Sequence, residues 1–439
     1  MGSGQRWRSR SESEGEAGMK EILELLAENT SVSDYKINIH QKESYELFFV
    51  KGKLETLRCT DTCDKEVTVY ADHDGFRGDA QFFVYPSTTE EDAKALIQES
   101  VDKALLIRNQ AFTLPAAEEG SFEVPSNFRD YDASELAALI SKSVFEANTI
   151  ENAALNSVEV FVNKHTERII NSRGLDKTQV RYDAMVEAIP TYNGETQSVE
   201  LYEQYNFSAM DADVLRREIF EKMDQVKARY IAKAPVHPLN CPVVLNIQEV
   251  SELMRQIAWD LNYASVYSHS NLFKKGESVQ KEILGDPIGI TMAGQVSGSV
   301  RSRCFDEDGL SLNSIRIVEN GKAVNYFGSN RYGQYLGETP TGSLPCLCAD
   351  AGTAVMPEGD WLEVISMSGL QVDFYNDYIG GEVRLAYHHT PEGMIPVTGI
   401  SVSGSLTDVL SHIRFSPETA VFGGYQGPEK AVINNMKIY

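Results

Sequence analysis

Two stretches in the middle of the chain alternate between apolar and polar residues, and this period of two limits the fold more than any other feature. They are SVEVFVNKHTERIINSRG at 157–174 and TQVRYDAMVEAIPTYNGETQSVELYEQYNF at 178–207. Successive side chains of a strand point to opposite faces of a sheet, so alternation is typical of half-buried strands. The turn sequences NSRG and YNGE interrupt the alternation. Together these features predict an antiparallel meander.

The rest of the pattern divides the chain into three modules. Residues 19–112 combine an amphipathic helix, strand-like runs joined by a DHDG hairpin, and a second helix. A linker rich in Pro, Ser and acidic residues precedes the second module, 130–233, which holds the meander between two helices. The third module, 238–439, opens with a helix at 246–262 and then becomes Gly-rich and β-like. Residues 1–18 lack the apolar stretch of a signal peptide and are predicted to be a disordered leader or an added extension.

Many strands with peripheral helices predict an α+β fold of multi-stranded, mostly antiparallel sheets. With 40 basic against 64 acidic residues, the net charge is −24. This charge argues against a protein that grips nucleic-acid phosphates or docks on anionic lipid. No apolar run has the length of a membrane span. The six cysteines show no disulfide-framework spacing, so we expect reduced thiols in the cytoplasm.

Short motifs for familiar chemistry are weak in this sequence. There is no phosphate loop or dinucleotide fingerprint, and GISVSG misses the G-x-S-x-G elbow of serine hydrolases by one residue. The eight histidines show no spacing that would put two metal ligands on one helical face. Cys346 and Cys348 would share one face of a strand and could hold a soft metal, but buried structural thiols are the favoured interpretation. The acidic cluster at 306–308 indicates a solvated loop, with a Ca²⁺ contact as the alternative.

The clearest helix signal is NIQEVSELMRQIAWDLN at 246–262. Asn246 can cap its start, and Glu249 follows at the spacing of a capping box. Apolar residues recur at steps of three and four, which gives the helix one apolar stripe. The stripe consists of Ile247, Val250, Leu253, Met254, Ile257 and Leu261. Taken alone, the polar residues on the other sides indicate a solvated face.

The segment RCFDEDGLSLNSIRIVENGKAVNYFGSNRYGQYLGETPTGS at 303–343 resembles the TldD/PmbA family. That family has an R-x-F-D-x-x-G segment, followed by an ENGK turn and a later T-G pair. The matching positions are Arg303, Phe305, Asp306, Gly309, Glu319, Asn320, Gly321, Thr341 and Gly342. The resemblance extends over nearly the whole chain from Met19, with IINSRG, KAPVHPLNCPVVLN and PVTGISVSGSLTDVLSHI as further landmarks.

Catalytic subunits of this family carry H-E-x-x-x-H on a helix soon after a VVL strand, where the histidines bind zinc and the glutamate acts as general base. Counting forward from VVL places these three positions at Arg255, Gln256 and Asp260. Arginine is a permanent cation that would repel Zn²⁺, and glutamine cannot take a proton from water. Asp260 alone falls short of three protein ligands. The resemblance therefore implies a PmbA (TldE)-like subunit with an emptied zinc helix.

The resemblance implies a non-zinc subunit of a TldD/TldE-type metalloprotease complex that acts on unfolded or leader peptides. Zinc would belong to a TldD-like partner in a heterodimer, and this chain would hold no cofactor and no catalytic residue. Nucleic acid and membrane are not expected partners. The alternative is a non-catalytic binding or regulatory homodimer, as the family's older name, modulator of DNA gyrase, suggests. A third possibility is that the chain cleaves peptides alone with an unrecognised site.

Two finer expectations concern named side chains. Arg255, Gln256 and Asp260 are expected to line the position that matches the partner's zinc helix. Arg303 and Asp306 are expected to form an ion pair that orders the turn after them.

Overall fold

The structure is a computed structural model and describes residues 21–439. The predicted leader at 1–18 and the first two residues of the predicted opening helix therefore lie outside the described residues. Residues 21–28 are helical, in line with their amphipathic pattern. Ile22 and Leu26 of this helix are buried in the core beside the first sheet.

The N-terminal half forms one nine-stranded sheet. Its strands are β1 (Asp34–Val50), β2 (Lys53–His73), β3 (Phe76–Val84), β4 (Asn109–Gln110), β5 (Glu119–Glu123), β6 (Ala153–Asn171), β7 (Asp176–Asn193), β8 (Ser198–Glu200) and β9 (Glu203–Phe207). Their order is β4-β3-β2-β1-β6-β7-β5, and β8 and β9 pair with β7. β1 of the first predicted module pairs with β6 of the second from Lys36 to Val50. The two predicted modules therefore share one sheet.

The predicted meander and hairpin are both present in this sheet. β6 pairs antiparallel with β7, which in turn pairs with β8 and β9. β2 and β3 pair antiparallel on either side of Asp74 and Gly75, the centre of the DHDG turn. These two residues have φ angles of 52° and 81°, as a type I′ turn requires. The period-two pattern and the turn sequences thus predicted these strands correctly.

The C-terminal part contains two further sheets. A nine-stranded sheet consists of β10 (Val243–Asn246), β15 (Trp361–Met367), β16 (Gln371–Asp373), β17 (Tyr378–Thr390), β18 (Gly393–Val397), β19 (Ile400–Ser405), β20 (Arg414–Phe415), β23 (Lys430–Ile433) and β24 (Lys437–Ile438). A six-stranded sheet consists of β11 (Ile290–Ala293), β12 (Ile315–Glu319), β13 (Lys322–Ala323), β14 (Cys346–Ala349), β21 (Thr419–Phe422) and β22 (Tyr425–Pro428). Among the described strands, each sheet has one parallel pair and is otherwise antiparallel. The predicted α+β class is confirmed.

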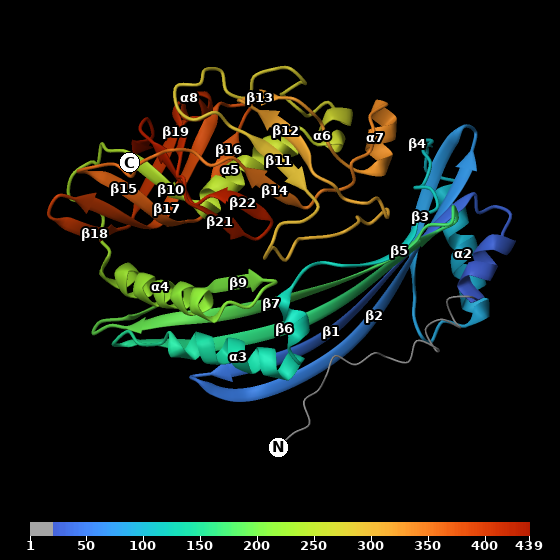
Figure 1. Ribbon diagram of the computed structural model, residues 1–439, viewed down its shortest axis with the longest axis horizontal. Coiled ribbons are helices and arrows are strands. Elements are labelled where there is room, and N and C mark those ends of the chain that lie inside the picture. The colour runs from blue at the N-terminus through green and yellow to red at the C-terminus, as the bar shows by residue number, and fades with distance from the viewer. Residues whose placement is uncertain (1–20) are drawn as a thin grey trace.

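Helices lie mostly around the sheets, as Figure 1 shows. They are α2 (Glu90–Ala104), α3 (Ala133–Glu146), α4 (Ala212–Ile231), α5 (Ile247–Asp260), α6 (Tyr263–Tyr267), α7 (Asn330–Leu336) and α8 (Leu406–His412), with a 3₁₀ turn at Asn127–Asp130. α3 and α4 pack against each other and against the N-terminal sheet. α4 also contacts β18, so one helix touches both halves of the chain.

Helix α5 lies in the core of the C-terminal domain, where it contacts strands of both C-terminal sheets. It follows β10 directly, and the Asn246 side chain accepts the N–H of Gln248 as its N-cap. The predicted apolar stripe is buried, apart from the half-buried Ile247. The capping box does not form: Glu249 is 3% exposed, and its Oε2 has no hydrogen-bond partner within the described chain. The position and the apolar face of the predicted helix are confirmed.

The curved N-terminal sheet runs beneath the C-terminal domain (Figure 1). Three small apolar clusters join the two parts. They are Ile169, Leu175 and Phe305; Tyr70, Phe112, Leu114 and Tyr335; and Ala228, Leu385 and Tyr387. The first cluster fixes the 303–309 segment against β6 and the turn after it.

Candidate functional site

A cavity of about 360 Å³ lies between the N-terminal sheet and the C-terminal domain. Its sheet side includes His40 from β1, Glu167 from β6 and Gln179 from β7. Its other side comes from residues between 301 and 312 and from Ser343. The segment that resembles the family motif therefore faces polar side chains of the sheet.

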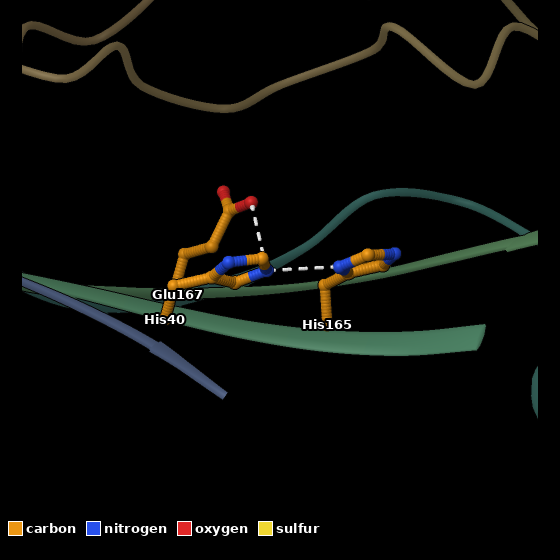
Figure 2. Close-up of side chains that lie close together, drawn as sticks. All are labelled: His40, His165 and Glu167. Carbon is orange, nitrogen blue, oxygen red and sulfur yellow. Dashed lines mark hydrogen bonds and ion pairs between the residues drawn. The ribbon is translucent and has the colours of Figure 1, made fainter. Parts of the chain in front are cut away.

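Two histidines and a glutamate meet beside this cavity (Figure 2). His40 lies directly opposite Glu167 in the β1–β6 register, and His165 precedes Glu167 by two residues, so all three share one face of the sheet. His40 Nε2 lies 2.9 Å from His165 Nδ1 and 3.9 Å from Glu167 Oε1. One ligand atom from each residue lies within 4.8 Å of the other two. Within residues 21–439, this is the one group of three or more His, Cys, Asp or Glu side chains placed to share a metal ion.

Burial favours the uncharged form of both imidazoles. It lowers the pKa of His40, and the neighbouring His165 lowers it further. Burial also lowers the pKa of His165, although the Asp183 carboxylate opposes this. For Glu167, burial raises the pKa, but the Arg181 and Arg303 guanidinium groups outweigh burial and bring the pKa below its usual value. The surroundings thus favour uncharged imidazoles beside an ionised carboxylate.

Side chains of β7 hold this group in place. Asp183 Oδ2 lies 2.8 Å from His165 Nε2, at hydrogen-bond distance though not in ideal alignment, and accepts from Arg181 Nη1 at 2.9 Å. Arg181 Nε donates to Glu167 Oε1 at 3.0 Å. Gln179 Nε2 donates to Glu167 Oε2 at 2.8 Å. β7 therefore orients both His165 and Glu167.

Arg255 and Gln256, which are predicted to match the partner's zinc-motif positions, have separate partners in the structure. Arg255 Nη2 lies 3.5 Å from the carbonyl oxygen of Phe422, and burial together with the nearby Arg301 lowers the pKa of Arg255. Gln256 Nε2 donates to Glu252 Oε1, one turn earlier, at 2.7 Å. A guanidinium group has no lone pair to give a metal.

Asp260 has a structural role at the end of α5. One carboxylate oxygen accepts the N–H of Leu272 and the other accepts the N–H of Phe273, both at 2.8 Å. The side chain thereby fixes the loop that follows α6. Because a catalytic zinc site takes three protein ligands and α5 offers no imidazole, the residues of this helix do not fit a zinc ion.

The predicted ion pair between Arg303 and Asp306 is wrong. Arg303 Nε instead lies 3.7 Å from Glu167 Oε2, across the cavity. Asp306 accepts two backbone N–H groups of its own turn at Oδ1 and the N–H of Ser343 at Oδ2. The backbone of two loops satisfies the buried carboxylate, while Arg303 faces the sheet.

The other residues of the family motif lie in turns and in the interface. Asn320 and Gly321 form the turn between β12 and β13, with φ angles of 48° and 71°. Gly309 and Gly342 also have positive φ angles, 86° and 80°. Phe305 is buried in the cluster against the N-terminal sheet. Of these residues, Phe305 lines the cavity, as do Arg303 and Asp306 of the same segment.

His40, His165 and Glu167 were not predicted as a group from the sequence. The two histidines are 125 residues apart, and only the pairing of β1 with β6 brings them together. The sequence contains one indication of this group. His165 and Glu167 are two apart on a predicted strand, which places them on one face.

The sequence profile of the PmbA/TldA metallopeptidase C-terminal domain matches residues 238–439. The C-terminal domain belongs to the TldD/PmbA family. The matched region contains α5, the core around it and the motif side of the cavity. A comparison with curated proteins finds no match to the chain.

Solved structures share the fold of both halves of the chain. TldE from Thermococcus kodakarensis is 14% identical with a TM-score of 0.75, covering 97% of this chain and 99% of that one. A protein of Bacteroides thetaiotaomicron, described as a proposed modulator of DNA gyrase, is 12% identical with a TM-score of 0.75, covering 97% and 98%. A Thermotoga maritima protein of similar description is 16% identical with a TM-score of 0.72, covering 96% and 100%. These likenesses show the fold of both halves.

No helix within residues 21–439 is both long enough and apolar enough to cross a bilayer.

Proposed function

We propose that this chain is a PmbA/TldE-like, non-zinc subunit of a TldD/TldE-type metalloprotease complex in the cytoplasm. Its partner would be a TldD-like subunit that carries H-E-x-x-x-H, and the substrate class would be unfolded or leader peptides. The observation that carries the proposal is the absence of zinc ligands of the catalytic motif from α5. This helix contains no histidine. It follows the VVL strand of a domain that matches the TldD/PmbA family, and the count from that strand predicts Arg255, Gln256 and Asp260 at the motif positions.

The surroundings of α5 support a role in peptide contact. β21 lies at the edge of the six-stranded sheet and packs against α5. Val421 and Phe422 on this strand are 39% and 40% exposed, and Arg255 reaches the carbonyl oxygen of Phe422. An extended peptide can bind by adding a strand to such an edge. A partner's zinc helix placed near this edge would then meet a peptide held in an extended form.

The test measures peptidase activity on three samples: the purified chain, a TldD-like subunit, and their mixture. The substrate is an unfolded, fluorescently labelled casein. A TldD-like subunit whose motif glutamate is replaced by glutamine serves as the matched inactive partner, because it keeps the zinc ligands and loses the general base. We expect no cleavage by the chain alone, and cleavage that rises when the active partner is added.

Two outcomes would overturn the proposal. Cleavage by the isolated chain would make it a peptidase in its own right. No change in cleavage on mixing, together with a stable homodimer in size-exclusion chromatography with light scattering, would favour the binding or regulatory homodimer.

A further inference from the structure

We propose that the N-terminal sheet carries a transition-metal site of its own, in which Zn²⁺ is held by His40 Nε2, His165 Nδ1 and the Glu167 carboxylate. The site shares no residue with α5. Under the proposed function, the chain is a non-zinc subunit only because α5 lacks the ligands of the catalytic zinc, so a separate site on the N-terminal sheet is compatible with it. The site goes beyond that function, since a complex whose catalytic zinc lies in the partner subunit does not require it.

The ligand atoms are close to the spacing that zinc needs. With Zn–N and Zn–O distances of about 2.0–2.1 Å and tetrahedral angles, two ligand atoms lie about 3.3 Å apart. The two imidazole nitrogens are 2.9 Å apart, and His40 Nε2 is 3.9 Å from Glu167 Oε1. The first distance must open and the second must close, each by about half an ångström. The half-exposed His40, with 41% of its side chain accessible, can make that adjustment.

The tautomers also suit a metal. Asp183 beside His165 Nε2 favours the proton on that nitrogen, which leaves a lone pair on Nδ1 facing His40. A carboxylate behind a ligating histidine is the usual support in metal sites, because it fixes the ring and its tautomer. Without metal, His40 Nε2–H donates to that lone pair. Moving this proton to His40 Nδ1 presents a second lone pair without any change in charge.

Glu167 can accept a metal while it keeps its present contacts. Each of its two oxygens takes one N–H donor, from Arg181 or Gln179, and a carboxylate oxygen has two lone pairs. Arg181 and Arg303 oppose the metal's charge, and Glu167 and Asp183 balance them. The two arginines then favour an anion as the remaining ligand, either hydroxide or a peptide carboxylate.

The donor set selects the metal and the kind of site. Two imidazoles and one carboxylate suit zinc and similar transition metals, whereas Ca²⁺ and Mg²⁺ prefer all-oxygen ligands. Three protein ligands leave one position open, as in catalytic rather than structural zinc sites. His40 and Glu167 line the cavity, so an open position on that side can receive a water or a peptide group. Cys346 and Cys348 of β14 do not form a competing metal site, because within residues 21–439 no group of three possible ligands includes them.

The test titrates Zn²⁺ into the full, metal-stripped chain by calorimetry, without partner or peptide, so its result is independent of the proposed function. We expect one saturable site. His40→Gln should weaken binding at least about tenfold, since even supporting residues of metal sites are worth that much. His412→Gln is the matched control: His412 has the same 41% exposure and also lies beside a carboxylate, Asp408 at 3.2 Å. It should bind zinc as the parent does.

A second variant and a second metal keep the test decisive. Glu167→Gln keeps the size of the side chain and removes its charge, so it should also weaken binding if His40→Gln is poorly folded. Co²⁺ in the same site should give visible d–d bands without the near-ultraviolet band of a cobalt–thiolate bond. Three results would overturn the proposal: no saturable site, equal loss in the His412→Gln control, or a thiolate band that places the metal on cysteines.

Discussion

Gly309 offers a direct test of how the two halves of the chain are held together. It has a φ of 86°, and an added Cβ would lie 2.7 Å from Cδ2 of Leu175 and 3.4 Å from Cγ2 of Ile169. Gly309→Ala should therefore destabilise the protein twice. The left-handed backbone costs about 1–2 kcal/mol for a residue with a Cβ, and overpacking costs about 1–3 kcal/mol. The expected loss in free energy of unfolding is about 2–5 kcal/mol.

Gly276 separates the two effects. It has nearly the same φ, 87°, and no atom of the described chain outside its immediate neighbours lies within 4 Å of the place that a Cβ would take. Gly276→Ala should therefore lose only the backbone part, about 1–2 kcal/mol. Urea unfolding followed by tryptophan fluorescence measures both losses.

Leu175 provides the rescue experiment. Leu175→Ala alone should cost about 2–5 kcal/mol, because its side chain is 1% exposed. In the double variant, the smaller side chain makes room for the new methyl group. The double loss should then be smaller than the sum of the single losses by about 1–3 kcal/mol. Additive losses, or equal losses for Gly309→Ala and Gly276→Ala, would refute the steric reasoning.

Three further predictions concern buried carboxylates. Asp260→Ala leaves the N–H groups of Leu272 and Phe273 without their partner. Urea unfolding should therefore show a free energy of unfolding lower by about 2–4 kcal/mol, and a loss below about 0.5 kcal/mol would contradict this role. Asp183→Asn should weaken Zn²⁺ binding about 10- to 100-fold in the same calorimetric titration, and unchanged affinity would show that it does not support the metal ligand. Burial raises the pKa of Glu249 to about 7 from an ordinary value of 4.5. The folded state then binds more protons between these values, so stability falls as pH rises from about 4.5 to 7. Glu249→Gln removes that decline. The free energy of unfolding of the variant, relative to that of the parent, should therefore be higher at pH 8 than at pH 5 by up to about 3 kcal/mol. A difference between variant and parent that does not change with pH in thermal melts would contradict this prediction.

The fold was predictable wherever one segment carried its own periodicity. The apolar stripe of α5 and the alternation of β6 and β7 needed no partner to be recognised. The sharing of one sheet by two predicted modules was not predictable, because pairing of β1 with β6 depends on register between distant segments. Glu249 shows the same limit locally: its spacing predicts a capping box, but tertiary packing buries it instead.

The same limit applies to the candidate site: some residues could be predicted from local sequence, and others depend on tertiary contacts. The prediction that Arg255, Gln256 and Asp260 take the zinc-motif positions on α5 needs only the local count from the VVL strand. Asp260 could not be assigned its partners, since they lie in a loop after the next helix. Proximity in sequence favours an ion pair of Arg303 with Asp306, whereas the carboxylate that Arg303 approaches is Glu167, on the other side of the cavity. Side chains that meet across strands are visible only once the register is fixed.

The pairing of β1 with β6 also has a consequence during synthesis of the chain. From the end of β1 at Val50 to the start of β6 at Ala153, 102 residues intervene. At a synthesis rate of about 5–20 residues per second, this separation corresponds to about 5–20 s. Throughout that interval the β1–β2 hairpin has one edge without its final neighbour, and such an edge can pair with another nascent chain. The central part of the chain, rather than either end, therefore decides when the newly made sheet becomes safe from aggregation.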